Sequence, residues 1–133
     1  MSQDKPDIKE ILVTVKQLLE SIANKSKGGE RYDALCGAFL LGVVDRELEC
    51  GERQDENQNR ELQVLLGKEG TLSDLYELFC QQVRCGELDE QWPTAFDFAL
   101  RQVIDKVSVT NPDYLATMHR ADTECENQQS PVK

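Results

Sequence analysis

The sequence predicts an all-α protein, a compact bundle of about five helices with a disordered C-terminal tail. Apolar residues recur every three to four positions along most of the chain, which is the spacing of one helix face. Glycines, prolines and capping side chains separate these segments, and no convincing strand, hairpin turn or internal repeat appears. With 133 residues, the chain has the size of one domain, predicted at 6–116 between a disordered N-terminus (1–5) and a polar tail (117–133).

The first predicted helix opens at Pro6 and Asp7, where Glu10 is placed to complete a capping box. The apolar residues that follow form one stripe: Ile8, Ile11, Leu12, Val15, Leu18, Leu19 and Ile22. A polar segment at 24–29 ends in two glycines, so we expect the helix to stop there and the chain to turn back.

The second predicted helix runs from about Glu30 to Cys50, with Gly51 as its C-terminal cap. It is apolar nearly all round, so we expect it to be the buried central helix. Small residues lie among the large ones, at Ala34, Gly37, Ala38 and Gly42. A glycine inside a helix costs about 1 kcal/mol relative to alanine, which predicts the close approach of a neighbouring helix or, alternatively, a groove for a ligand.

Three further helices are predicted over 52–66, from Thr71 to Gly86, and from Pro93 to Asn111-Pro112. The first of them is very polar in its first part, through the run 54–59, so its start is expected to be exposed. Trp92 is expected to cap that end of the core. Short connections between the segments favour neighbouring helices that pack antiparallel.

Charge and composition exclude several classes of function. The chain carries 25 acidic and 15 basic residues, a net charge of -10, which repels nucleic acids and anionic lipids. The most apolar run, 34–44, is shorter than the roughly 20 residues of a membrane span. Five cysteines without a C-x-x-C pair indicate reduced thiols, and no export signal is recognised, so a cytoplasmic protein is predicted.

The side chains needed for catalysis are scarce. The only histidine, His119, lies in the polar tail, and no metal-ligand or nucleotide-binding pattern occurs. We therefore expect no cofactor and no catalytic activity. Asp45, Glu47 and Glu49 cluster beside Arg46 at the end of the second predicted helix. They form either an ion-pair network between helices or a functional carboxylate cluster.

Several segments in order resemble a known family. They are Arg46-Glu47-Leu48 with Gly51, Leu65-Leu66-Gly67, Cys80 with Arg84 and Gly86, Arg101 with Val103 and Lys106, and Val109 with the segment from Asn111 to Leu115. The chain is similar, from about Pro6 to Leu115, to small helical bacterial proteins of unknown function (DUF6285-like). The resemblance implies a companion of aminoglycoside-phosphotransferase-like kinases. Such a companion is similar to the small accessory subunit of the 4-hydroxyacyl-CoA kinase of levulinate breakdown.

The sequence thus predicts a non-catalytic accessory subunit that binds and supports a kinase acting on hydroxyacyl-CoA. Two alternatives are an acyl or acyl-CoA binding module, in the groove beside Gly37, and an enzyme that uses a cysteine or the carboxylate cluster. A homo-oligomer is left open.

Seven residues that match the family could bind the partner or form structural ion pairs: Arg46, Glu47, Arg84, Arg101, Lys106, Asn111 and Tyr114. In the structural role, Arg101 and Lys106 would pair with Asp45 or Glu47. In the binding role, Arg84, Arg101 and Tyr114 would be anchors.

Overall fold

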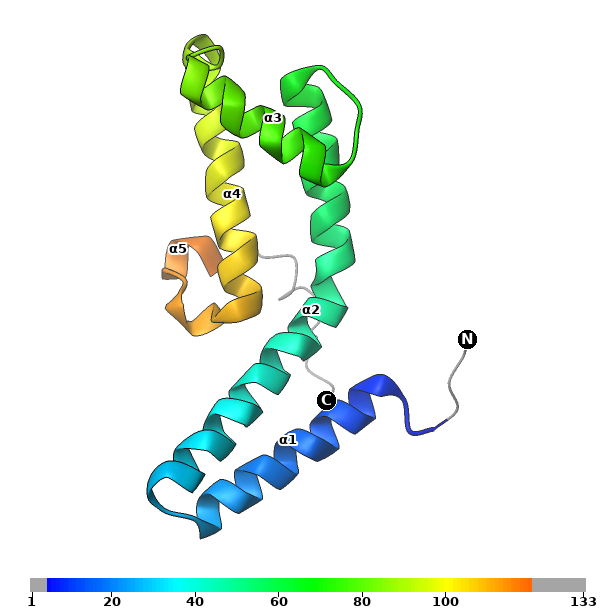
Figure 1. Ribbon diagram of the computed structural model, residues 1–133, viewed down its shortest axis with the longest axis vertical. Helices are drawn as coiled ribbons and strands as arrows, with labels where there is room; N and C mark the ends of the chain where they lie inside the picture. Colours follow the sequence, from blue (N-terminus) through cyan, green and yellow to red (C-terminus); the bar gives the residue numbers. More distant parts are fainter. Residues whose placement is uncertain (1–4, 121–133) are drawn as a thin grey trace. The chain divides into compact units, whose positions relative to one another are not determined.

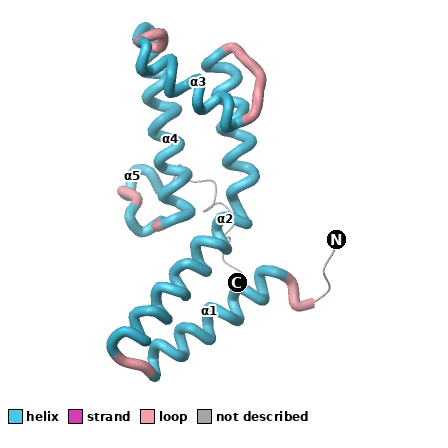
Figure 2. Tube along the Cα trace, in the orientation of Figure 1, coloured by secondary structure: helices cyan, strands magenta, loops and turns pink. Residues whose placement is uncertain are grey.

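The computed structural model describes residues 5–120, and helices are the only regular elements in this part of the chain (Figure 1; Figure 2). The α-helices are α1 (Ile8–Lys25), α2 (Gly28–Leu66), α3 (Leu72–Cys85), α4 (Trp92–Thr110) and α5 (Thr117–Arg120). Two short 3-10 turns, η1 (Asp89–Gln91) and η2 (Pro112–Tyr114), flank α4. The prediction of an all-α fold with about five helices is confirmed.

The chain divides into two compact units, Met1–Glu49 and Cys50–Lys133. The first unit, called here the hairpin, consists of α1 and the part of α2 up to Glu49. The second, called here the C-terminal unit, contains the rest of α2 together with α3, α4 and α5. Each unit is described separately below.

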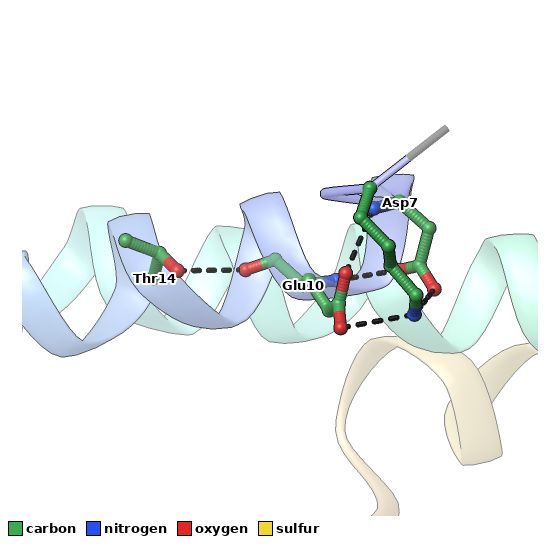
Figure 3. A network of polar contacts seen from close by, with 4 residues as sticks. Asp7, Glu10 and Thr14 are labelled. Carbon is green, nitrogen blue, oxygen red and sulfur yellow. Dashed lines mark hydrogen bonds and ion pairs between the residues drawn. The ribbon is translucent and has the colours of Figure 1, made fainter. Parts of the chain in front are cut away.

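Helix α1 begins at the predicted capping box (Figure 3). The Glu10 backbone N–H donates to Asp7 Oδ1 at 2.9 Å, and the Asp7 backbone N–H donates to Glu10 Oε2 at 2.9 Å. Lys5 Nζ lies 3.2 Å from Asp7 Oδ2 and 3.0 Å from Glu10 Oε1. Thr14 Oγ1 donates to the Glu10 carbonyl at 2.8 Å. The two bonds of the capping box satisfy backbone N–H groups that the start of the helix leaves unpaired.

In the hairpin, α1 lies alongside the first part of α2, and small residues line the contact (Figure 1). Ala23, Ala34 and Ala38 are at most 6% exposed. A β-carbon at Gly37 would stand 3.1 Å from Leu19 Cδ1. The Leu19 side chain of α1 therefore fills the space that the glycine leaves. The predicted close approach of a helix is confirmed, and α1 occupies the groove suggested for an acyl group.

The prediction that the second helix is buried all round is wrong. Six large apolar residues of this part of α2 are 44–69% exposed, namely Tyr32, Leu35, Phe39, Leu40, Val44 and Leu48. The physical reason is that a single neighbouring helix covers one face of α2 within the hairpin, and an apolar surface on every side needs several neighbours.

Helix α2 does not end at Gly51 as predicted, but continues through it to Leu66 and has 39 residues in all. The predicted helices 30–50 and 52–66 are therefore one element. Cys50 is 1% exposed and Gly51 is also buried. Because an interior glycine costs a helix only about 1 kcal/mol, packing of the surrounding turns outweighs the preference of glycine for a helix end. Gly67, with φ at 63°, is the glycine that follows the helix.

The C-terminal unit is built around Leu62 of α2, Leu75 of α3 and Phe98 of α4, which are at most 2% exposed. The rings of Phe79 and Phe98 meet edge-on, with centroids 5.2 Å apart. The predicted caps at Thr71 and Gly86 and the predicted proline in the first turn of α4 are all present. Trp92 does not cap the core, because it is 63% exposed.

The expectation of a disordered tail is corrected in part. Residues 117–120 of the predicted disordered tail form α5; 121–133 lie outside the described residues, as do 1–4 of the predicted N-terminal segment. Cys36, Cys80 and Cys85 are free thiols, as the sequence predicts.

Candidate functional site

The apolar stripe of α1 is wider than the strip that faces α2. Leu12 and Leu19 are partly buried and Ala23 is fully buried. Five further aliphatic residues, 40–58% exposed, fall within one sector of about 80° at 3.6 residues per turn: Ile8, Ile11, Val15, Leu18 and Ile22. Val13, 43% exposed, lies outside this sector.

Aliphatic residues of α2 continue this surface. Leu40, Val44 and Leu48 follow Gly37 at positions i+3, i+7 and i+11, so they share its side of the helix. Because Gly37 touches Leu19 of α1, that side of α2 borders the exposed stripe of α1. The eight residues Ile8, Ile11, Val15, Leu18, Ile22, Leu40, Val44 and Leu48 are called here the aliphatic face, and they are 40–61% exposed.

The opposite side of α2 in the hairpin carries aromatic residues. Tyr32, Leu35 and Phe39, at i, i+3 and i+7, are 69%, 44% and 51% exposed and are called here the aromatic flank. Gly42 lies on the same side, three residues after Phe39, and a β-carbon there would stand 3.3 Å from Arg46 Nη1 and 3.9 Å from Lys16 Nζ. The cationic side chains of Arg46 and Lys16 thus lie beside the aromatic flank. The aliphatic face, in contrast, consists of hydrocarbon side chains alone.

A row of polar side chains, called here the polar seam, joins three helices in the C-terminal unit. Gln54 Nε2 donates to the Asp105 carbonyl and to Ser108 Oγ, both at 3.4 Å, and Ser108 Oγ donates to the Asp105 carbonyl at 2.6 Å. Gln58 Nε2 donates to Asp105 Oδ2 at 3.3 Å, and Tyr76 Oη donates to Gln58 Oε1 at 3.0 Å. Gln54 and Ser108 are 6% and 3% exposed, so these bonds compensate for the loss of water.

The polar seam was missed by the sequence reasoning, which expected an exposed helix start at 52–59. The signal was present, because Gln54, Gln58 and Glu61 recur at i, i+4 and i+7 and so share one face of α2. Buried glutamine is uncommon, however, and only the packing of α4 against this face shows that the face is buried.

Burial of the ring, followed by the negative charges of Asp105 and Asp55, raises the pKa of Tyr76 to about 12. A tyrosine in the unfolded chain titrates near pH 10. Below that pH the phenol is neutral in both states. Above it, the unfolded state loses the proton first, so the unfolded state is favoured and stability falls as the pH rises from about 10 to about 12.

Replacing Tyr76 with phenylalanine is expected to remove this part of the pH dependence. Tyr76→Phe also loses the hydrogen bond to Gln58, so the variant is less stable than the wild type near neutral pH, and the difference narrows above about pH 10. Urea denaturation of both proteins, followed by circular dichroism from about pH 8 to about pH 12, measures the difference. A constant difference across this range would contradict the assignment.

The structure does not gather the seven residues singled out from the sequence into one cluster. Arg46 and Glu47 belong to the hairpin and the other five to the C-terminal unit. Arg101 donates from Nε and Nη2 to Glu61 Oε2, at 3.1 and 2.8 Å, so its ion pair is with Glu61 and not with the predicted Asp45 or Glu47. Both members are partly exposed, so the pair contributes at most about 1 kcal/mol.

The three predicted anchors lie at separate places in the C-terminal unit. Arg84 is in the last turn of α3, Arg101 is in the middle of α4, and Tyr114, 82% exposed, follows α4 in η2. With 19 residues, α4 is about 28 Å long. Asn111 is the C-terminal cap of α4, where its backbone N–H donates to the Val107 carbonyl at 2.8 Å.

Lys106 is an exposed residue of α4, and its carbonyl accepts a hydrogen bond from Thr110 Oγ1 at 2.9 Å. A role of these residues in partner binding stays a prediction.

The carboxylate cluster at the end of the hairpin takes part in an ion pair, as the structural alternative predicted. Lys9 Nζ of α1 lies 3.7 Å from Glu49 Oε1 of α2, and the pair links the two helices. Among residues 5–120, no group of three or more His, Cys, Asp or Glu is arranged to hold a metal ion. Within the same range, no helix has the length and apolar character to cross a membrane.

A small cavity of the C-terminal unit has a mostly apolar lining that includes Val64, Leu65 and Phe98, and Arg60, Thr94 and the Glu61–Arg101 pair complete it. Its volume is about 270 Å³, slightly below the roughly 300–1,000 Å³ of small-molecule sites. Arg101 is already neutralised by Glu61. The cavity therefore adds little to the acyl-binding alternative, and the exposed surfaces of the hairpin are the stronger candidates.

A family model described as a domain of unknown function (DUF6285) matches residues 24–114. The chain belongs to this family. The matched segment contains all of α2, α3 and α4, and so includes the aromatic flank and the polar seam of this DUF6285 protein. No curated protein and no solved structure matches the chain.

Proposed function

We propose that this DUF6285 protein is a non-catalytic accessory subunit that binds a partner enzyme through the aromatic flank of α2. The observation that carries the proposal is the exposure of Tyr32, Leu35 and Phe39, at 69%, 44% and 51%, on a helix that is otherwise held in place by α1. A rigid helix with large exposed apolar side chains on one side is a surface that proteins use for binding.

The spacing of the three residues defines the form of the partner site. Anchors at i, i+3 and i+7 are those with which a helix binds to an apolar groove. Tyrosine contributes strongly to interfaces because its ring is large and loses little conformational entropy on binding. Arg46, on the same side of α2, would lie at the rim and favour an acidic group beside the groove.

The identity of the partner rests on the family resemblance. We propose an aminoglycoside-phosphotransferase-like kinase chain, which acts in the cytoplasm on a hydroxyacyl-CoA in the breakdown of levulinate or a related hydroxy acid. The kinase chain would supply the nucleotide site, the magnesium ion and the catalytic base. This chain would support the active form of the kinase without contacting the reacting atoms.

The Phe39→Ala substitution is expected to weaken binding to the kinase chain by about 10- to 100-fold, because truncating an anchor at the centre of an interface costs about 2 kcal/mol or more. Phe96→Ala is the matched control, since Phe96 is also a phenylalanine on a helix and is 58% exposed. Co-expression, size-exclusion chromatography and titration calorimetry with the purified kinase measure the effect.

Two results would count against the proposal. Separate elution of the two wild-type chains, together with unchanged kinase activity without this chain, would remove the accessory role. Loss of binding with Phe96→Ala but not with Phe39→Ala would place the interface on α4 instead of on the aromatic flank.

A further inference from the structure

We propose that the aliphatic face of the hairpin binds the same face of a second copy of this chain, so that two hairpins form a four-helix bundle. This inference goes beyond the accessory role and does not depend on the kinase. It concerns the side of the hairpin opposite to the aromatic flank.

The packing inside the hairpin leaves most of its larger apolar residues at least 40% exposed. Its residues with at most 6% exposure are Ala23, Ala34 and Ala38, which bury little hydrocarbon. Helices in water obtain most of their stability from burial of an apolar face. Two helices whose contact is lined by alanine bury little apolar surface between them. The eight residues of the aliphatic face, 40–61% exposed, supply the missing surface once another helix pair covers them.

The exposed area is close to what a stable dimer needs. A fully exposed Val, Leu or Ile side chain presents on the order of 100 Å², so eight side chains that are about half exposed present about 400 Å² per copy. Homodimer interfaces are about 65% apolar, which corresponds to about 1,200 Å² for the pair. Stable protein interfaces begin at about this size.

The charge of the hairpin permits contact with a second copy. Residues 5–49 contain seven Lys or Arg and eight Asp or Glu, a balance of -1 out of the -10 of the whole chain. The eight residues of the aliphatic face are uncharged, and the acidic residues on the same side of α2, Glu30 and Asp33, are exposed and lie before Leu40 at the beginning of the helix. Two identical faces can therefore meet over their apolar residues, with these carboxylates at the end of the face.

The residue types also favour a second copy over a different partner at this face. It contains Ile, Leu and Val but no aromatic residue and no arginine, in the pattern of a helix-bundle core. Aromatic residues and arginine, which are enriched at interfaces between different proteins, lie on the aromatic flank instead. A two-fold dimer through the aliphatic face leaves that flank available to the kinase.

The full-length chain without any kinase provides the test. Light scattering coupled to size-exclusion chromatography, from about 1 to about 100 μM protein, is expected to give a mass that rises with concentration to twice the 15.1 kDa of one chain. Higher salt should strengthen the dimer, because the net charge of -10 on each copy is screened. A mass of one chain at all concentrations would overturn the proposal.

A pair of variants locates the interface. Leu18→Glu combined with Leu40→Glu places two charges in the aliphatic face and is expected to raise the dissociation constant at least about 100-fold. Gln17→Glu combined with Ser21→Glu is the control, since it adds the same charge at two exposed positions of α1 outside that face. Equal dimerisation by both variants would overturn the assignment of the face.

Hydrogen exchange of the wild-type protein tests the proposed face without any substitution, so it is informative even if a variant does not fold. Amides of 8–22 and 40–48 are expected to gain protection as the protein concentration increases, because association suppresses local opening of the hairpin. A doubled mass without added protection in these segments would place the dimer contact elsewhere and contradict the proposal. None of these results depends on binding to the kinase.

Discussion

Phe98→Ala is expected to lower the free energy of unfolding of the C-terminal unit by about 4 kcal/mol. Phe98 is 2% exposed, and its ring lies 5.2 Å from that of Phe79 and 6.1 Å from that of Tyr76. Its removal loses the burial of a large ring and leaves a cavity that α2, α3 and α4 fill only partly, and such truncations cost about 3–5 kcal/mol.

The matched control for this prediction is Phe96→Ala, two residues earlier on the same helix. Phe96 is 58% exposed, so its truncation should change the free energy of unfolding by less than about 1 kcal/mol. Urea denaturation followed by circular dichroism compares the two variants with the wild type. Similar losses of stability in both variants would contradict the assignment of the core.

Glu52→Pro is expected to cost about 3 kcal/mol or more, because residue 52 lies inside the continuous helix α2. Proline there removes a hydrogen bond of the helix and its ring clashes with the preceding turn. The sequence alone predicts a different result. If a helix started at residue 52, proline would occupy its first turn, where it is well tolerated.

The control for Glu52→Pro is Glu52→Ala. The side chain of Glu52 is exposed, and alanine favours helix, so this variant should stay within about 0.5 kcal/mol of the wild type. Thermal and urea unfolding of the three proteins give the comparison, and the helical signal at 222 nm shows any break. A stable Glu52→Pro protein with full helical content would contradict a continuous α2.

Local signals in the sequence identified most helix ends correctly. The capping box at Asp7 and Glu10, the cap at Thr71 and the glycines at 67 and 86 act through groups a few residues apart, so the residues themselves contain the information. Gly51 shows where this reasoning fails. The same residue type ends a helix at 86 and continues one at 51, because packing decides whether the small cost of an interior glycine is compensated.

The candidate surfaces could be predicted less well from the sequence than the helix ends. The apolar stripes of α1 and α2 were evident from their spacing, but periodicity cannot tell which part of a stripe another helix covers. The spacing of Gln54, Gln58 and Glu61 on one helix face was also apparent in the sequence. Because these residues are polar, the face was expected to be exposed to solvent. Only its contacts with α4 show that it forms a buried network.

By itself, the sequence determined that this DUF6285 protein is all-α, where most of its helices begin and end, and that small residues in α2 permit close approach of α1. These properties follow from backbone preferences and side-chain spacing within one or two helical turns. Tertiary structure alone decided that α2 continues through Gly51, that the polar seam is buried, and that the aliphatic face and the aromatic flank remain exposed. The physical reason is that burial depends on which surfaces meet across distant parts of the chain.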